Sequence, residues 1–141
     1  MRFPEYTSRI LALSETLYRW LGALSGLDNS RREKLANYAD EIAATLARAA
    51  DAAVKLKSMP ADEIARRQAV REFGRIAGYV ENIVEALEHH LDGRKLAGVK
   101  RRLEQLSGGV PLEDASLPFE RVDRIVAAEG YFRALADGLR T

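Results

Sequence analysis

The chain has 141 residues, enough for one domain that buries about two thirds of the surface exposed by its unfolded chain. Hydrophobic residues make up 47% of the chain and charged residues 30%, a composition that excludes a disordered protein. The formal net charge is only +1, so binding to nucleic acid or a membrane would need a local patch of charge. Cysteine is absent, which excludes disulfides, thiol nucleophiles and cysteine-based zinc sites.

The sequence also bears on the compartment of the protein. No apolar run approaches the length of about 20 residues that is needed to cross a bilayer. Residues 1–9 contain no apolar stretch like that of a secretory signal. The lack of cysteine is compatible with a reducing environment. We therefore expect a cytoplasmic protein that does not bind a membrane.

An apolar repeat of seven residues runs through the first two predicted helices, over about 4–26 and 30–58. In the first helix and the turn after it, the repeat consists of Tyr6, Ile10, Leu13, Leu17, Trp20, Leu24 and Leu27. In the second helix it consists of Leu35, Ala39, Ile42, Leu46, Ala49, Ala53 and Leu56. Such spacing places one apolar stripe along each helix, and each stripe must be buried against other helices. Ser30 and Glu33 form a capping-box pattern at the start of the second helix.

Two further helices follow. Pro60 ends the second helix and suits the first position of a third, which is predicted to run to about Leu91. Asp92 is placed to cap a shorter fourth helix that ends near Ser107. Gly108-Gly109 is a strong stop signal after it.

Residues 108–117 form the one long loop, and a last helix is predicted to begin at Pro118. Its inner side is expected to carry Phe119, Val122, Ile125, Val126, Phe132, Leu135 and Leu139. There are no strand signals, and the connections are short. We therefore predict an all-α fold, an antiparallel bundle of four or five helices that forms a single domain over residues 1–141.

The third predicted helix contains Gly74 and Gly78, whereas the second is rich in alanine. A glycine inside a helix costs about 1 kcal/mol relative to alanine, so the pair costs about 2 kcal/mol. A close helix crossing would offset this cost, because small residues let two backbones approach to the short end of the usual range of about 8–10 Å. The simpler arrangement packs the alanines of the second helix on the glycines within one chain. The alternative places a helix of a partner chain against them.

Charge is segregated along the same helix. Its first half carries Arg66, Arg67, Arg71 and Arg75, and its second half carries Glu81, Glu85, Glu88 and Asp92. This order opposes the helix dipole, which favours acids early and bases late. The arginines also repel one another at spacings of four residues.

Three arrangements would balance these charges. Neighbouring helices of the same chain would neutralise each half, and the basic segment 94–102 and the acids of the loop and last helix favour this solution. A two-fold antiparallel dimer would instead set each basic half against the acidic half of its partner. An external anion is the third possibility. The predicted partner-binding residues are Arg67, Arg71, Arg75, Glu81, Glu85 and Glu88.

A basic cluster on the fourth predicted helix consists of Lys95, Lys100, Arg101 and Arg102. Phosphate contacts need only such cations, whereas strand recognition adds stacking or base-edge groups. Segments 72–75 and 85–91 are similar in spacing to the third helix of bacterial four-helix-bundle proteins, namely those encoded by rRNA intervening sequences and the accessory proteins of diversity-generating retroelements. The resemblance implies rings that bind reverse transcriptase and nucleic acid through basic surfaces.

His89 and His90 are the only histidines. The stretch His89-His90-Leu91-Asp92-Gly93 resembles the His-x-Leu-Lys-Gly signature of histidine phosphotransfer domains, which are also four-helix bundles. The resemblance implies that His89 is the phospho-acceptor, with Asp92 in place of the family's lysine. No Glu-x-x-His pair, nucleophile elbow, Walker loop or dinucleotide fingerprint is present. No catalytic residue, metal ligand or cofactor is therefore predicted.

These observations predict a non-catalytic interaction or assembly module that binds a protein partner and self-associates. The alternative is a nucleic-acid-binding accessory protein that uses the basic cluster. Phosphotransfer at His89 is the third hypothesis.

Overall fold

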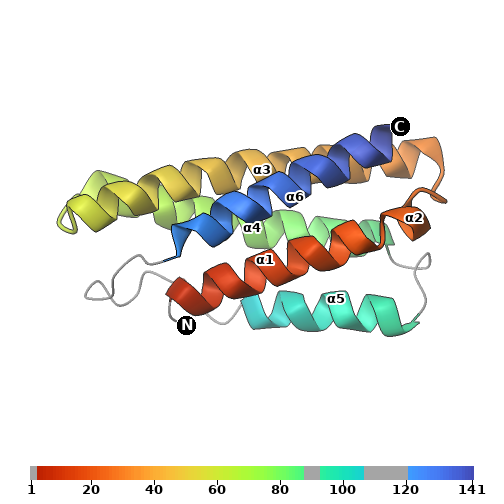
Figure 1. Ribbon diagram of the computed structural model, residues 1–141, viewed down its shortest axis with the longest axis horizontal. Helices are drawn as coiled ribbons and strands as arrows, with labels where there is room; N and C mark the ends of the chain where they lie inside the picture. Colours follow the sequence, from red (N-terminus) through yellow and green to blue (C-terminus); the bar gives the residue numbers. More distant parts are fainter. Residues whose placement is uncertain (1–2, 88–92, 107–120) are drawn as a thin grey trace.

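A computed structural model describes residues 3–87, 93–106 and 121–141 (Figure 1). Helices hold 91% of the described residues, and none of these residues lies in a β-strand. The helices are α1 (Phe3–Arg19), α2 (Leu21–Leu24), α3 (Asn29–Ser58), α4 (Glu63–Leu87), α5 (Gly93–Leu106) and α6 (Val122–Arg140). The predicted all-α class is confirmed. Within the described parts of the chain, no helix is both long enough and apolar enough to cross a bilayer.

The long helices lie side by side along the longest axis of the molecule (Figure 1). α3 packs against both α4 and α6, and α6 also packs against α1. The shorter α5 lies beside α1 and contacts both α1 and α4. α4 thus packs mainly against α3 and α5, and the ring of its Phe73 also contacts α1.

Both seven-residue repeats form the core, as predicted. Every member of the two repeats is buried except Trp20, which is half-buried. At one end of the core, the Phe73 ring of α4 meets the rings of Phe3 and Tyr6 edge-on, at centroid distances of 6.1 and 4.9 Å. Such edge-to-face pairs add about 0.5–1.5 kcal/mol each to the burial of the rings. Burial also raises the pKa of the Tyr6 hydroxyl.

Several predicted helix starts are wrong by a few residues because other residues provide the caps. The side chain of Asp28, not Ser30, caps α3, and its Oδ1 accepts a hydrogen bond from the Arg31 backbone N–H at 2.8 Å. Asp62 likewise accepts from the Ala65 N–H at 3.0 Å, so α4 begins at Glu63 and not at Pro60. An aspartate satisfies the orphan amides of a first helical turn as well as a capping box does.

The first and last helices also differ from the prediction. The first is divided at Trp20, which separates α1 from α2. In α6, the predicted inner position of Val126 is wrong, because this side chain is 55% exposed. Ile125, Ala128, Phe132, Leu135 and Leu139 form the buried stripe of α6. Val126 lies one residue off that stripe, which turns it about 100° away from the core. Phe119, also predicted on the inner side, lies outside the described residues.

Candidate functional site on the outer face of α4

α4 buries one face and exposes the other along its whole length. The buried residues are Ala65, Ala69, Glu72, Phe73, Ile76, Val80, Ile83, Val84 and Leu87. The exposed residues that follow one another along the opposite side are Arg67, Arg71, Gly74, Gly78, Glu81 and Glu85. Steps of three and four residues keep these six on one side of a helix. We refer to this set as the α4 outer face.

The two glycines lie on this outer face and not in the interior. A Cβ atom added to Gly74 or Gly78 meets no atom within 4 Å, and both residues are exposed. The simpler of the two arrangements predicted for these glycines is therefore wrong, because the alanines of α3 do not pack on them. The helical cost of the two glycines, about 2 kcal/mol, is not offset by a close crossing within the chain.

The four charged residues of the α4 outer face also have no partner among the residues that the structure describes. Among the described residues, none forms a hydrogen bond or an ion pair with Arg67 or Arg71, and the same holds for Glu81 and Glu85. Neutralisation by neighbouring helices, which the charge pattern favoured, does not reach these four side chains within the described part of the chain. The face thus presents a basic half and an acidic half to the solvent.

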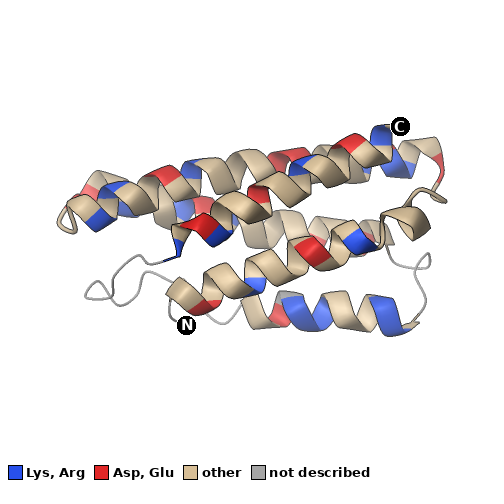
Figure 2. Ribbon diagram, viewed as in Figure 1, with Lys and Arg blue, Asp and Glu red and all other residues tan. Residues whose placement is uncertain are grey.

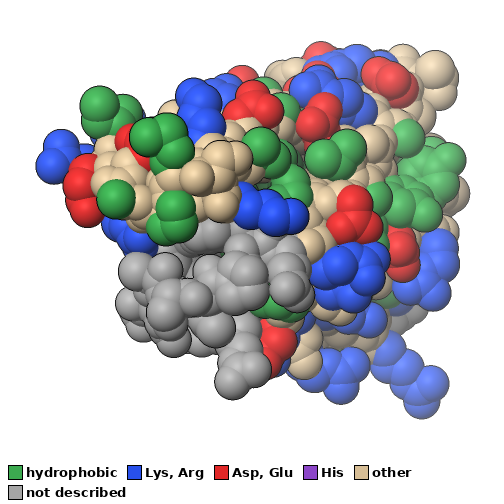
Figure 3. Space-filling view, turned by 60° about the vertical axis from the view of Figure 1, so that its left-hand side comes forward, with side chains coloured by type: hydrophobic (Ala, Val, Ile, Leu, Met, Phe, Trp, Pro, Cys, Tyr) green, Lys and Arg blue, Asp and Glu red, His purple; other side chains and the backbone are tan. Residues whose placement is uncertain are grey.

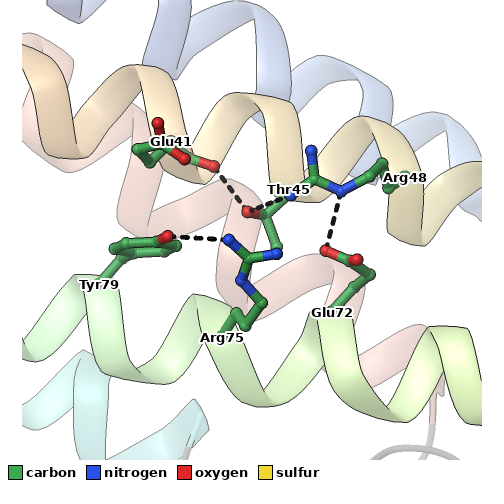
Figure 4. Close-up of polar contacts among 6 residues, drawn as sticks. All are labelled: Glu41, Thr45, Arg48, Glu72, Arg75 and Tyr79. Atoms are coloured by element: carbon green, nitrogen blue, oxygen red, sulfur yellow. Dashed lines mark hydrogen bonds and ion pairs between the residues drawn. The ribbon is translucent and has the colours of Figure 1, made fainter.

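Arg75 differs from the other two predicted arginines. Its Nη2 donates to the Tyr79 hydroxyl at 3.1 Å, and its guanidinium carbon lies 5.9 Å from the Tyr79 ring centroid. The hydrogen bond and the charge interaction with Tyr79, followed by the charges of Glu72 and Glu41, raise the pKa of Arg75. Figure 4 shows this side chain beside Glu41 of α3. Arg75 is thus held at the edge of the outer face towards α3.

An ion pair that was not predicted from the sequence joins α3 to α4 (Figure 4). Arg48 Nε donates to Glu72 Oε2 at 3.1 Å, and Arg48 Nη2 donates to the Thr45 hydroxyl at 3.2 Å. The Thr45 hydroxyl in turn donates to the Glu41 backbone carbonyl at 2.6 Å. Glu72 is only 5% exposed. A signal was available, because Glu72 is the one charged residue at the 3.6-residue spacing of the apolar face of α4.

An open pocket of about 350 Å³ borders the basic half of the outer face. It is lined by Ile64, Arg67, Gln68, Arg71 and Glu72. Ile64 is 79% exposed, and it belongs to a group of exposed hydrophobic residues near the turn between α3 and α4, at the end of the molecule that comes forward in Figure 3. The other members of this group are Val54 and Met59. The pocket combines an apolar contact with two cations.

A second open pocket lies between α1 and α6. Its volume is about 360 Å³, and it is lined by Glu15, Tyr18, Arg19 and Tyr131. The Tyr18 and Tyr131 rings lie 5.6 Å apart in a tilted arrangement. This pair was not predicted, since the two tyrosines lie 113 positions apart in the sequence and no local pattern relates them.

The basic cluster of the alternative hypothesis lies on α5, where Figure 2 shows several cationic residues. Lys100 and Arg101 are exposed, and Lys95 and Arg102 are half-buried. Lys95 and Lys100 each interact with another group of the protein. The cluster is accessible at two of its four positions, and part of its charge is already engaged.

Two predicted features lie outside the described residues: the partner-binding residue Glu88, and the segment around His89 that resembles phosphotransfer domains. In the described parts of the chain, no group of three or more acidic, histidine or cysteine side chains is placed to hold a metal ion.

Comparisons with known proteins found no match to a protein-family model, a curated protein or a solved structure. The two family resemblances drawn from the third predicted helix thus remain predictions.

Proposed function

We propose that this protein is a non-catalytic assembly module of the cytoplasm, an antiparallel helical bundle that self-associates through the α4 outer face. The observation that carries the proposal is a fully exposed helix face on which Arg67, Arg71, Glu81 and Glu85 have no partner among the described residues. Helix faces of this kind are expected to lie against another protein, where opposite charges specify the partner.

The glycines support the same proposal. Exposed positions inside a helix normally favour residues with a high helical propensity, because packing does not decide the choice there. Gly74 and Gly78 are the least favourable ordinary choice, at about 1 kcal/mol each. Contact with a second helix would offset this cost, since a surface without side chains allows two backbones to approach closely.

The size of the face sets the expected affinity. α4 has 25 residues and is therefore about 37 Å long. A contact strip about 12 Å wide along it would bury roughly 900 Å² over both partners, which is below the range of about 1,200–2,000 Å² for stable interfaces and typical of a weak, transient one. Exposed ion pairs add only about 0–1 kcal/mol each. We therefore expect association in the micromolar range.

Sedimentation equilibrium of the purified chain from about 1 μM to 1 mM tests the proposal. The weight-average mass should rise from 15.7 kDa towards twice that value as the concentration increases. A matched control replaces the exposed Val126 of α6 by serine, which changes the surface away from α4 and should leave the association unchanged. A mass of 15.7 kDa over the whole range would refute self-association.

Nucleic-acid binding through α5 is the second candidate, and the exposed Lys100 and Arg101 favour it. Phosphate contacts of this kind weaken steeply as salt increases. Fluorescence anisotropy with labelled RNA and DNA should be measured at about 50 and 200 mM salt, with the charge-reversed variant Lys100→Glu/Arg101→Glu as the comparison. Salt-sensitive binding that the variant loses would support this candidate. Binding that is equally weak in both proteins would exclude it.

A further inference from the structure

The α4 outer face has a symmetry that the proposed self-association does not by itself require. Exposed residues that lie at equal distances before and after Ile76 correspond to each other along this face. Glycine corresponds to glycine, and each arginine corresponds to a glutamate, so the sign of the charge is inverted. The pairs at equal distances from Ile76 are Gly74 with Gly78 (two residues), Arg71 with Glu81 (five residues) and Arg67 with Glu85 (nine residues). All six paired residues are exposed.

A two-fold axis between antiparallel helices makes use of this symmetry. Such an axis brings each residue of one helix level with the residue of the partner at the same distance on the other side of the centre. With the axis at the level of Ile76, Arg71 lies level with the partner's Glu81, and Arg67 lies level with the partner's Glu85. The two-fold axis also repeats each contact, so each of the two kinds of ion pair forms twice and the dimer contains four ion pairs.

We propose that two copies of this chain pair α4 against α4 in antiparallel orientation, centred on Ile76, with Gly74 against the partner's Gly78. This inference rests on the proposed function and names its partner and register. The two backbones come closest at the glycines, where added Cβ atoms would hold them apart. The pairing also sets the basic first half of each α4 beside the acidic second half of the other, which compensates a charge order that opposes the helix dipole.

Other possible binding partners would match the charges on only part of the α4 outer face. A parallel α4 pair would place Arg67 and Arg71 beside their own copies, where like charges repel. An acidic peptide would match the arginines and leave Glu81 and Glu85 without partners. A nucleic acid would be repelled by those two glutamates. An antiparallel second copy is the occupant that matches both halves.

Charge reversal tests the pairing. The basic half is reversed in Arg67→Glu/Arg71→Glu, and the acidic half in Glu81→Arg/Glu85→Arg. Each variant turns four attractive pairs into four repulsive ones, so each should self-associate about 100-fold more weakly than the wild type. An equimolar mixture of the two should form a heterodimer as tight as the wild-type dimer. Circular dichroism should show unchanged helix content in both, because all four side chains are exposed.

The variant with all four substitutions determines the orientation of the helices. In the antiparallel pairing its two halves remain complementary, so it should self-associate like the wild type but should not pair with the wild type. In a parallel pairing the outcome is reversed, because the fourfold variant would then pair with the wild type and repel itself.

Spin labels measure the register. The chain has no cysteine, so Glu63→Cys and Asn82→Cys each provide a single labelling position. These residues lie 13 and 6 residues from Ile76. At about 1.5 Å per residue, label-to-label separations of about 39 Å and about 18 Å are expected along the paired helices. A parallel pair would give about 10 Å at both positions, which is the distance between two packed helix axes.

The outcomes separate this inference from the proposed function. A monomer at all concentrations would overturn both. A dimer whose dissociation constant changes less than threefold in the two charge-reversed variants would overturn the α4 pairing and the surface named in the proposed function, and self-association would then use another surface. Labels that give equal short distances would overturn the antiparallel orientation alone, because they indicate a parallel α4 pair.

Discussion

A double substitution at Gly74 and Gly78 tests both whether the α4 outer face is exposed in the monomer and whether it takes part in self-association. In the single chain, nothing lies within 4 Å of a Cβ atom added at either position. Alanine therefore introduces no clash, and each substitution should contribute the helix-propensity difference of about 1 kcal/mol. Gly74→Ala/Gly78→Ala should raise the free energy of unfolding of the monomer by about 2 kcal/mol.

The expected shift in melting temperature follows from the size of the chain. An unfolding entropy of about 2.1 cal/mol/K per residue amounts to about 0.3 kcal/mol/K over 141 residues. A gain of about 2 kcal/mol then raises Tm by about 7 °C. Circular dichroism melts should be recorded at about 1 μM, where the weak dimer is dissociated. Urea titrations of the same samples would provide the free energy independently.

Two other glycines provide matched controls. Gly130 of α6 is exposed and also has nothing within 4 Å of an added Cβ, so Gly130→Ala should stabilise the chain by about 1 kcal/mol. At Gly138 an added Cβ would lie 2.5 Å from Leu21 Cδ2 and 3.3 Å from Leu21 Cγ. Gly138→Ala should therefore gain little or lose stability, because the Leu21 side chain must move.

The double variant also reports on the dimer. The added methyl groups lie at the closest approach of the proposed helix pair, so self-association should weaken at least tenfold, whereas Gly130→Ala should leave it unchanged. A double variant that is no more stable than the wild type would show that Gly74 and Gly78 are packed and not exposed. A stabilised variant with unchanged self-association would refute the placement of the glycines in the interface.

Three further predictions concern the fold. Glu72→Gln should destabilise the chain by about 2 kcal/mol in urea titrations, because it removes the charge of a buried carboxylate that is paired with the partly exposed Arg48. A loss below about 0.5 kcal/mol would contradict the pairing. The hydrogen bond from Arg121, together with its charge, lowers the pKa of Asp123 below its ordinary value, so the contribution of this pair to stability is present above the ordinary pKa and is lost as the pH falls through the lowered pKa. The Tm difference between the wild type and Asp123→Asn should accordingly vanish towards pH 2, and a constant difference would refute this account. Val126→Ser should change the free energy of unfolding by less than about 0.5 kcal/mol because Val126 is exposed, whereas Ile125→Ala should lower it by about 2–5 kcal/mol because Ile125 is buried. Similar losses at both positions would contradict the orientation of α6.

The spacing of apolar residues was sufficient to predict the helices and most of their buried faces. Leu13 and Ile42 are members of seven-residue repeats, and each repeat is buried as predicted, with only Trp20 half-exposed. This information is local, because 3.6 residues per turn determine which side chains share a side of a helix. Helix starts were less certain, since Asp28 and Ser30 are both suitable caps and lie two residues apart.

The charge segregation of α4 and its two glycines are visible in the sequence alone, but only the tertiary structure determines whether these residues face another helix or the solvent. The contact of Arg48 with Glu72, 24 residues apart, depends on how α3 packs against α4. Whether Gly74 faces α3 or the solvent likewise depends on which neighbours surround the helix, and the structure places it outside. Periodicity determines which residues share a face, whereas the packing of helices distant in the sequence determines which faces remain uncovered.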